Sequence, residues 1–302
     1  MNVGPDWLGV GFPRCGTSAL AWGMLHHPAV AIHRLVQPRR RAFWIWKERH
    51  ELDHSPLNPV CMQRWQATFD VPGYLSGEYT TWLAATSGPG QGVIEVVDCA
   101  ERVRQYCPEA KFLVMVREPG ERAWSHWKKA YLGWGHLAWE TAGLTFREAI
   151  EVEAERGPWI QSAVCPTHRP MPLLQRGKYD EHLAHWFDVF PDRDRTLVLC
   201  FERFIQDPGA TYRRVFAFLG LPEYEVPRTG KRNASSDEEL SSSDRAWLDD
   251  FFAPHNAALT TVLGPDVSER IPWLERATHG TAREPHEVRH SGQRNRAAVA
   301  GR

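Results

Sequence analysis

A strand pattern, a glycine-bearing turn and a helix pattern follow one another at the start of the sequence. Residues 6–12 are mainly apolar, and apolar residues then recur at helical spacing. Two further runs, residues 112–116 and 196–201, are almost continuously apolar, which is typical of strands buried on both faces. Such strands, alternating with helices, predict an α/β fold of three layers with a central, mainly parallel sheet. Weaker candidate strands are residues 30–32 and 94–97.

The helix patterns between these strands have recognisable ends. Asp207 is an N-cap type followed by proline, and Gly220 is the expected stop of the same helix. Residues 236–239 have the spacing of a capping box before a later apolar helix. Two long connections, residues 33–75 and 132–177, are less regular, and long connections in compact domains are often functional.

The length of 302 residues suits one large α/β domain, which we expect to span residues 1–277. Residues 278–302 are rich in Arg, His, Gly and Ala without periodicity, and we expect a disordered tail there. The charges nearly cancel, because 36 Lys and Arg face 37 Asp and Glu for a net charge of -1. This balance argues against a nucleic-acid partner or a polybasic membrane binder, so any anion site must be local.

Targeting and disulfide patterns are also absent from the sequence. No apolar run approaches the length of about 18 residues that a membrane span needs, and the first residues lack the regions of a signal peptide. The six cysteines show neither a C-x-x-C pair nor zinc-finger spacing. We therefore expect reduced thiols and a cytoplasmic location, with one disulfide in an oxidising compartment as the alternative.

The turn after the first strand is the strongest motif. Gly11 and Gly16 have the spacing of a Walker A loop, in which backbone N–H groups and a helix N-terminus bind phosphate. A Walker A loop has lysine after its second glycine, whereas this chain has Thr17 there and carries its cation at Arg14. We expect a phosphate-binding loop with a displaced positive charge, which disfavours a magnesium-dependent kinase or NTPase.

A second motif follows the apolar run at residues 112–116. Arg117 comes directly after this strand, so we expect it at the carboxyl edge of the sheet, where ligands bind in open α/β folds. Pro119 begins the next helix, and Ser125 lies about two turns into it. Ser125 can therefore join Arg117 around one anion.

Together these motifs resemble those of the sulfotransferases that use 3′-phosphoadenosine 5′-phosphosulfate (PAPS). Residues 13–18 resemble the 5′-phosphosulfate loop of that family, and residues 117–125 resemble its 3′-phosphate strand and helix. Further similar segments are His27-Pro28, 179–191, 201–221 and 231–235. The resemblance covers roughly residues 6–275. It implies a P-loop-NTPase-like sulfotransferase architecture, closer to the carbohydrate, protein-tyrosine and bacterial types.

The resemblance also implies a donor and a set of site residues. The donor is PAPS, the product is 3′-phosphoadenosine 5′-phosphate (PAP), and no metal takes part. Arg14 is implied as a catalytic clamp on the charge that grows on the leaving phosphate. The residues implied for nucleotide binding are Arg14, Cys15, Gly16, Thr17, Ser18, Arg117, Ser125, Lys231, Arg232 and Asn233.

The general base that the acceptor hydroxyl needs is less clear. Family members that act on carbohydrate or protein tyrosine often carry glutamate after the His-Pro turn. In this chain His33 is the nearest residue there with a suitable pKa. Glu78 matches a second family segment on its glutamate alone. We take His33 as the first candidate base and Glu78 as the second.

The 14 tryptophans are the most unusual feature of the composition. Four of them, Trp7, Trp22, Trp186 and Trp247, fall at periodic core positions. Trp124 and Trp127 flank Ser125 and are candidates to border the nucleotide. In or beside the irregular connections lie Trp44, Trp46, Trp65, Trp82, Trp134, Trp139 and Trp159. This distribution predicts an aromatic cleft that suits a ring-bearing or apolar acceptor better than a polyanionic glycan.

Two other functions stay open on the sequence alone. One is a non-catalytic module that binds PAPS or PAP, which the missing glutamate supports. The other is a P-loop kinase, against which the displaced cation argues. The acceptor (a small molecule, a phenol or a glycan) and the oligomeric state are not fixed by the sequence.

Overall fold

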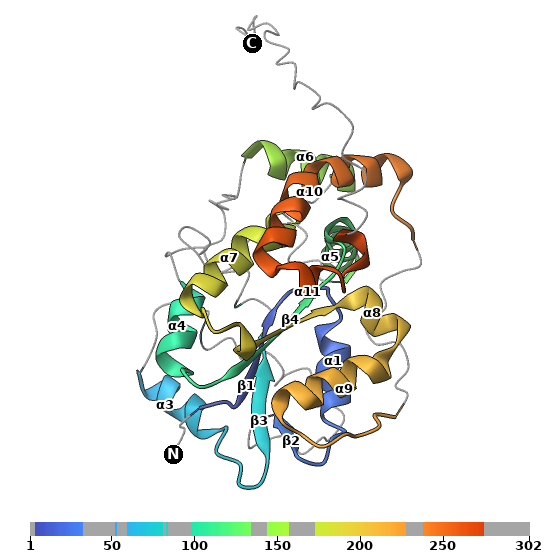
Figure 1. Cartoon of the computed structure of the whole chain (residues 1–302). Helices are drawn as coiled ribbons and strands as arrows, with labels where there is room; N and C mark the ends of the chain where they lie inside the picture. Colours follow the sequence, from blue (N-terminus) through green and yellow to red (C-terminus); the bar gives the residue numbers. More distant parts are fainter. Residues whose placement is uncertain are drawn as a thin grey trace, which may run out of the picture.

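A parallel sheet is the centre of the fold. The computed structural model describes residues 4–32, 52, 59–80, 83, 98–133, 144–156, 173–227 and 238–274. Within these ranges five strands form one sheet in the order β2-β3-β1-β4-β5, and every neighbouring pair is parallel (Figure 1). The strands are β1 (Trp7–Gly11), β2 (Val30–Ile32), β3 (Leu75–Tyr79), β4 (Lys111–Val116) and β5 (Thr196–Cys200). The expected α/β class is confirmed.

Four of these strands lie where apolar patterns predict them, whereas β3 has no such pattern. Its sequence is Leu-Ser-Gly-Glu-Tyr, and it lies beside β1 with Glu78 level with Leu8. Ser76 is fully buried, and its backbone N–H donates to the Asp6 carboxylate at 2.8 Å. The weaker candidate strand at residues 94–97 lies outside the described residues.

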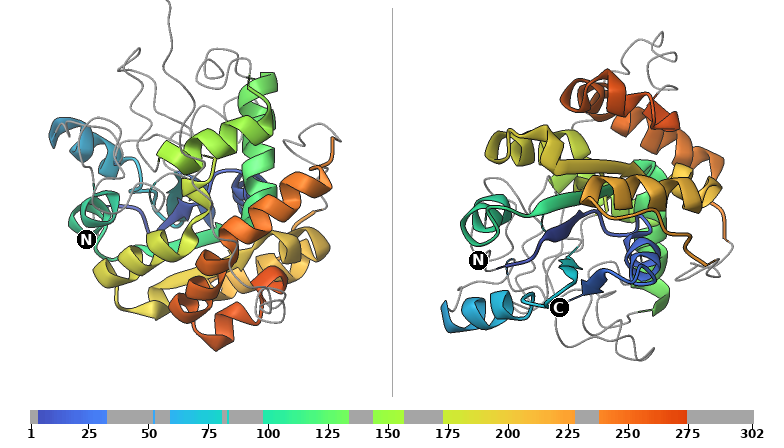
Figure 2. Two further views of the ribbon diagram at one scale, coloured as in Figure 1. Left: turned by 90° about the horizontal axis from the view of Figure 1, so that it is seen from above. Right: turned by 60° about the horizontal axis from the view of Figure 1, so that its bottom comes forward.

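Helices cover both faces of the sheet, which confirms the three-layer arrangement (Figures 1 and 2). One face is covered by α1 (Thr17–Met24), α8 (Phe201–Gln206) and α9 (Pro208–Leu219). The other is covered by α4 (Cys99–Tyr106) and α7 (Tyr179–Val189). Beyond them lie α5 (Pro119–Gly133), α10 (Ser242–Leu263) and α11 (Pro265–Ser268). The long connections hold α3 (Pro59–Ala67), α6 (Phe146–Arg156) and the 3₁₀ turn Gln175–Gly177.

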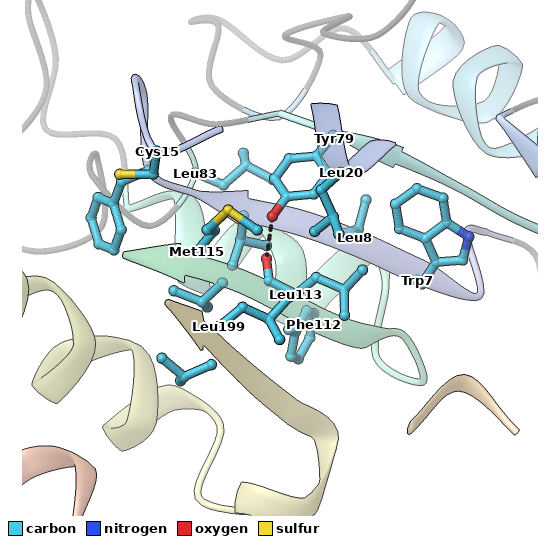
Figure 3. Close-up of a cluster of buried hydrophobic side chains, with 14 of the residues drawn as sticks. Trp7, Leu8, Cys15, Leu20, Tyr79, Leu83, Phe112, Leu113, Met115 and Leu199 are labelled. Atoms are coloured by element: carbon cyan, nitrogen blue, oxygen red, sulfur yellow. Dashed lines mark hydrogen bonds between the residues drawn. The ribbon is translucent and has the colours of Figure 1, made fainter. Parts of the chain in front are cut away.

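One large cluster of buried side chains joins the sheet to its helices. Phe112 of β4 lies against Trp186 of α7 and against Phe190, which caps the end of that helix, with ring centroids 5.1 and 4.5 Å apart. Each fully buried side chain of this kind contributes about 1.5–3 kcal/mol to folding. Figure 3 shows Cys15 at one end of the cluster and Trp7 at the other. The loop that follows β1 is therefore anchored in the core.

The helix ends agree with the sequence at one helix and differ at another. Asp207 caps α9 by accepting a first-turn N–H, and Gly220 ends it with φ 77°. The expected capping box at residues 236–239 is wrong, because α10 begins later. Ser241 is its N-cap, and the hydroxyl oxygen of Ser241 accepts the N–H of Asp244 at 3.0 Å.

The tryptophans divide differently from the prediction. Trp7, Trp22 and Trp186 are buried as expected, whereas Trp247 is only partly buried. The placement of Trp65 beside an acceptor cleft is wrong, since this residue of α3 is fully buried in the core. Its indole N–H donates to Glu78 at 3.1 Å, and that partner makes the burial favourable. Outside the described residues lie Trp44, Trp46, Trp82, Trp134, Trp139 and Trp159.

The cysteines that the structure describes are not in disulfides. They are Cys15, Cys61, Cys99, Cys107 and Cys200. Cys165 and residues 278–302 lie outside the described part of the chain, so the domain limit at residue 277 stays a prediction. Among the helices that the structure describes, none combines the length and the apolar character that crossing a bilayer requires.

Candidate active site

The loop after β1 has a backbone that few side chains permit. Gly16 has φ 82°, in the left-handed region. A Cβ atom there would lie 2.6 Å from the Phe201 ring, so both conformation and space require glycine. Arg14 has φ 70° despite its side chain. Such a conformation costs about 1–3 kcal/mol and is found most often at ligand sites.

The N-terminus of α1 follows this loop directly. Gly16 is the N-cap and offers no side-chain acceptor. The first N–H groups of the helix, from Thr17 and Ser18, have no earlier turn to donate to. They lie at the positive end of the helix dipole, an arrangement that binds anions. The Cys15 N–H instead donates to the Phe12 carbonyl at 3.3 Å, inside the loop.

Arg14 and Ser125 are brought together from the two predicted motifs. The Nε and Nη2 atoms of Arg14 donate to the Ser125 hydroxyl oxygen at 3.2 and 3.1 Å. Ser125 lies on α5 and is only 3% exposed. Arg117, directly after β4, donates from Nη1 to the Arg14 carbonyl at 3.3 Å. The carboxyl ends of β1 and β4 therefore carry one shared cluster of donors.

Arg117 is held by groups from three other elements. Its guanidinium lies over the Phe201 ring at 4.7 Å and pairs with Glu121 at 3.5 Å. The Tyr179 hydroxyl donates to the Arg117 carbonyl at 2.9 Å and lies 3.6 Å from the Cys15 sulfur. The Tyr179 hydroxyl thus contacts both the loop after β1 and the loop after β4. Sequence reasoning treats it as a core residue of α7, although a buried tyrosine hydroxyl needs such a partner.

The site concentrates positive charge. Burial and the nearby Arg117 lower the pKa of Arg14 from 12.5 to about 10, and Arg122 adds to the effect. A phosphate or sulfate group placed here would relieve this repulsion. Burial raises the pKa of the Cys15 thiol to about 11. The Cys15 side chain is therefore a neutral part of the loop and no nucleophile at neutral pH.

Behind this cluster lies a second, fully buried group on α5. Arg122 donates from Nη1 to His126 Nδ1 at 3.3 Å and from Nη2 to the Leu173 carbonyl. Burial, together with Arg176 and Arg122, holds the pKa of His126 well below its ordinary value. His126 is therefore neutral at pH 7, with its proton on Nε2 because Nδ1 accepts from Arg122. It therefore adds no further positive charge beside the arginines.

Glu78, the second candidate base, lies on β3 and is 2% exposed. One carboxylate oxygen accepts the Trp65 indole N–H at 3.1 Å, and the other accepts the Thr80 hydroxyl at 2.8 Å. Both oxygens are therefore engaged within the protein, and the role of Glu78 as a base stays a prediction. His33, the first candidate base, lies outside the described residues, as do Lys231, Arg232 and Asn233.

Comparison with known proteins agrees with this geometry. The sequence profile of the sulfotransferase family matches residues 7–225. The bifunctional heparan sulfate N-deacetylase/N-sulfotransferase 2 of Bos taurus is 23% identical over 294 residues, which cover 89% of this chain and 30% of that protein. The heparan sulfate glucosamine 3-O-sulfotransferase 6 of Homo sapiens is 28% identical over 219 residues, covering 72% of this chain and 52% of that protein. The chain thus spans about a third to a half of the length of these relatives.

A solved structure has the same architecture. A sulfotransferase from Alicyclobacillus acidocaldarius superposes with a TM-score of 0.62 at 25% identity, covering 88% of this chain and 99% of that one. The matched profile spans most of the chain and includes both anion-site motifs, which sets the kinase interpretation aside. The chain therefore belongs to the sulfotransferase family.

Proposed function

We propose that the protein transfers a sulfuryl group from PAPS to a hydroxyl or amine of an acceptor. The observation that carries this proposal is the meeting of Arg14, Arg117 and Ser125 at the N-terminus of α1. These donors come from two motifs that the family uses for the two ends of the donor nucleotide. The displaced cation and family membership both favour sulfuryl over phosphoryl transfer.

The chemistry asks the protein for positioning and charge stabilisation more than for covalent work. The acceptor oxygen or nitrogen forms a bond to sulfur, and the bond between sulfur and the bridging oxygen of the 5′-phosphate breaks. Negative charge grows on that phosphate as it leaves. The guanidinium of Arg14 and the N–H groups of Thr17 and Ser18 are suited to stabilise it, as an oxyanion hole does. Arginine cannot supply a proton here, so Arg14 acts as a fixed charge.

Ser125 is suited to connect the two anion subsites. Its oxygen accepts two N–H bonds from Arg14, which leaves its own O–H free to donate. A 3′-phosphate held by Arg117 can accept that proton in a hydrogen bond. The orientation of Arg14 would then depend on the 3′-phosphate, and nucleotides lacking this group would bind and react less well.

The acceptor and its base belong to the same proposal. His33 and Glu78 stay the candidate bases, and the acceptor proton passes to one of them as the new bond forms. The relatives act on heparan sulfate by name. This similarity makes a sugar hydroxyl or amine one class of acceptor that we propose. The other class is the ring-bearing acceptor that the tryptophans predict.

A binding and transfer experiment tests the proposal. PAP at about a hundred times its Kd should stabilise the fold by about 2.7 kcal/mol without magnesium, seen as a rise in melting temperature. Transfer of radiolabelled sulfate from PAPS should be lost in Arg14→Ala and Arg117→Ala but kept in Arg104→Ala, a change at an exposed side chain of α4. No response to PAP or PAPS would overturn the proposal. Tight PAP binding without transfer to any acceptor would favour the non-catalytic module.

A further inference from the structure

A second candidate site lies beside α5, and Arg14, Arg117 and Ser125 are not among the residues that line it. A cavity of about 390 Å³ lies between α5, α6 and the start of α10, and Figure 2 shows α6 beside α5. Trp124 and Trp127 of α5 line it together with Phe146 of α6 and Leu144. Small-molecule sites commonly have volumes of about 300–1,000 Å³ and mainly apolar walls. The space therefore fits one small molecule that carries a ring.

The aromatic wall of this cavity is already formed. The indole rings of Trp124 and Trp127 stack with centroids 5.2 Å apart and an angle of 10° between their planes. The Phe146 ring stands steeply to both, at 5.0 and 5.8 Å. Each ring restricts its neighbours, so an incoming ring meets a fixed surface and little ordering is needed.

The opposite wall is tied to α5 through one carbonyl group. The Glu238 carbonyl accepts the Trp124 indole N–H at 3.0 Å and the Lys128 ammonium at 2.7 Å. The same ammonium lies 5.1 Å from the centre of the Trp124 ring. These bonds hold Glu238 at the cavity, which its neighbour Glu239 also lines.

The charges around the cavity are opposite in sign to those of the donor cluster. The residues that line it include three acidic ones, Glu238, Glu239 and Asp244, and one basic one, Arg147, and the Lys128 ammonium lies over the Trp124 ring of its wall. Arg147 is engaged with Asp244, to which its Nε donates at 2.7 Å. Glu238 and Glu239 are exposed, and Glu238 interacts electrostatically with the Lys128 ammonium. The two carboxylates outnumber this one ammonium. An anion is therefore disfavoured here, and a cation is favoured.

We propose that this cavity binds a small organic amine. Its ring or alkyl body packs against Trp127 and Phe146, and its ammonium group lies among the carboxylates of Glu238 and Glu239. The aromatic faces and the carboxylates both attract a positive charge, so the two walls select the same ligand class. The inference rests on the lining residues alone and does not require the chain to transfer sulfate.

Three probe compounds separate the two contributions. Phenethylamine has both ring and ammonium, 3-phenylpropanoate replaces the ammonium with a carboxylate, and ethylamine lacks the ring. We expect isothermal titration calorimetry to show phenethylamine binding at least about tenfold more tightly than either of the others. Equal binding of 3-phenylpropanoate would overturn the proposal, and so would the absence of any phenethylamine binding.

Paired variants locate the site. Glu238→Gln with Glu239→Gln changes two exposed side chains and should weaken phenethylamine binding about tenfold. Glu109→Gln with Glu269→Gln removes the same charge from exposed positions elsewhere and should change nothing. Saturating PAP should leave phenethylamine bound, because Arg14, Arg117 and Ser125 do not line this cavity. Equal weakening in both double variants, or displacement by PAP, would contradict the assignment.

Discussion

Replacing Arg14 by lysine should convert a fixed charge into one that is lost as the pH rises. Burial and the nearby Arg117 lower the pKa of Arg14 from 12.5 to about 10, a difference of about 2.5 (12.5 − 10). The same surroundings acting on a lysine, whose ordinary pKa is about 10.4, should lower its pKa well below that value. Only the ammonium form attracts phosphate, so Arg14→Lys should lose PAP affinity as the pH rises through the lowered pKa of the lysine. The loss should approach a factor of about ten per pH unit.

Titration calorimetry with PAP from about pH 7 to 9.5 measures this effect. The phosphates of PAP keep a constant charge across this range, because their second pKa is about 6. The wild-type affinity should stay nearly level to about pH 9, since its guanidinium stays charged. Arg104→Lys, at an exposed position, is the matched control and should follow the wild type. A level profile for Arg14→Lys, or an equal decline in the wild type, would refute the reasoning.

Three further substitutions test separate contacts of the fold and the site. Gly16→Ala places a Cβ atom 2.6 Å from the Phe201 ring and should lower the free energy of unfolding by more than about 1 kcal/mol. The control Gly73→Ala, also at positive φ but in open space, should lower it by less. Equal urea midpoints for the two variants would contradict this. Tyr179→Phe removes the hydrogen bond to the Arg117 carbonyl and should weaken PAP binding by about 0.5–1.5 kcal/mol in calorimetry, so unchanged affinity would show that this bond does not support the site. Trp65→Phe leaves a buried Glu78 oxygen without its N–H donor and should cost about 1–3 kcal/mol of unfolding free energy in urea, whereas an unchanged midpoint would show that the bond contributes nothing.

The parts of the fold that the sequence predicts are those whose burial is local and apolar. β1, β4 and β5 are runs of apolar residues, and parallel strands buried on both faces need no other signal. β3 escapes prediction because two of its buried residues are polar. Ser76 is satisfied by Asp6, which is 70 residues away in the sequence, and Glu78 is satisfied by Thr80 within the same segment and by Trp65 of α3. Local patterns cannot show that such partners exist.

The residues of the candidate site also divide into those that the sequence predicts and those that it does not. Arg14, Arg117 and Ser125 could be placed together because each lies at a fixed offset from a strand end, and strand ends meet at one edge of a parallel sheet. The contacts of Tyr179 with the two loops could not be predicted from the sequence, since a tyrosine at helical spacing has the pattern of a core residue. Its hydroxyl contacts depend on how α7 packs against two loops.

The aromatic cavity was equally hidden from the sequence. Trp124 and Trp127 lie on the helix that carries Ser125, and they line a cavity with Phe146, Glu238 and Glu239. That they border the nucleotide stays a prediction. Segments far apart in the chain build this cavity. The sequence does not show that their charged residues lie at one site, because that depends on how α5, α6 and α10 pack together.

The most direct test of the proposed function follows sulfur from donor to acceptor. The protein would be incubated with PAPS carrying radiolabelled sulfur and a diverse extract of hydroxyl and amine compounds, and the products analysed by mass spectrometry. We predict a labelled product heavier by one sulfo group, formed in equal amount with PAP and absent with Arg14→Ala. PAP release without any labelled acceptor, or the same product yield from Arg14→Ala, would contradict the account.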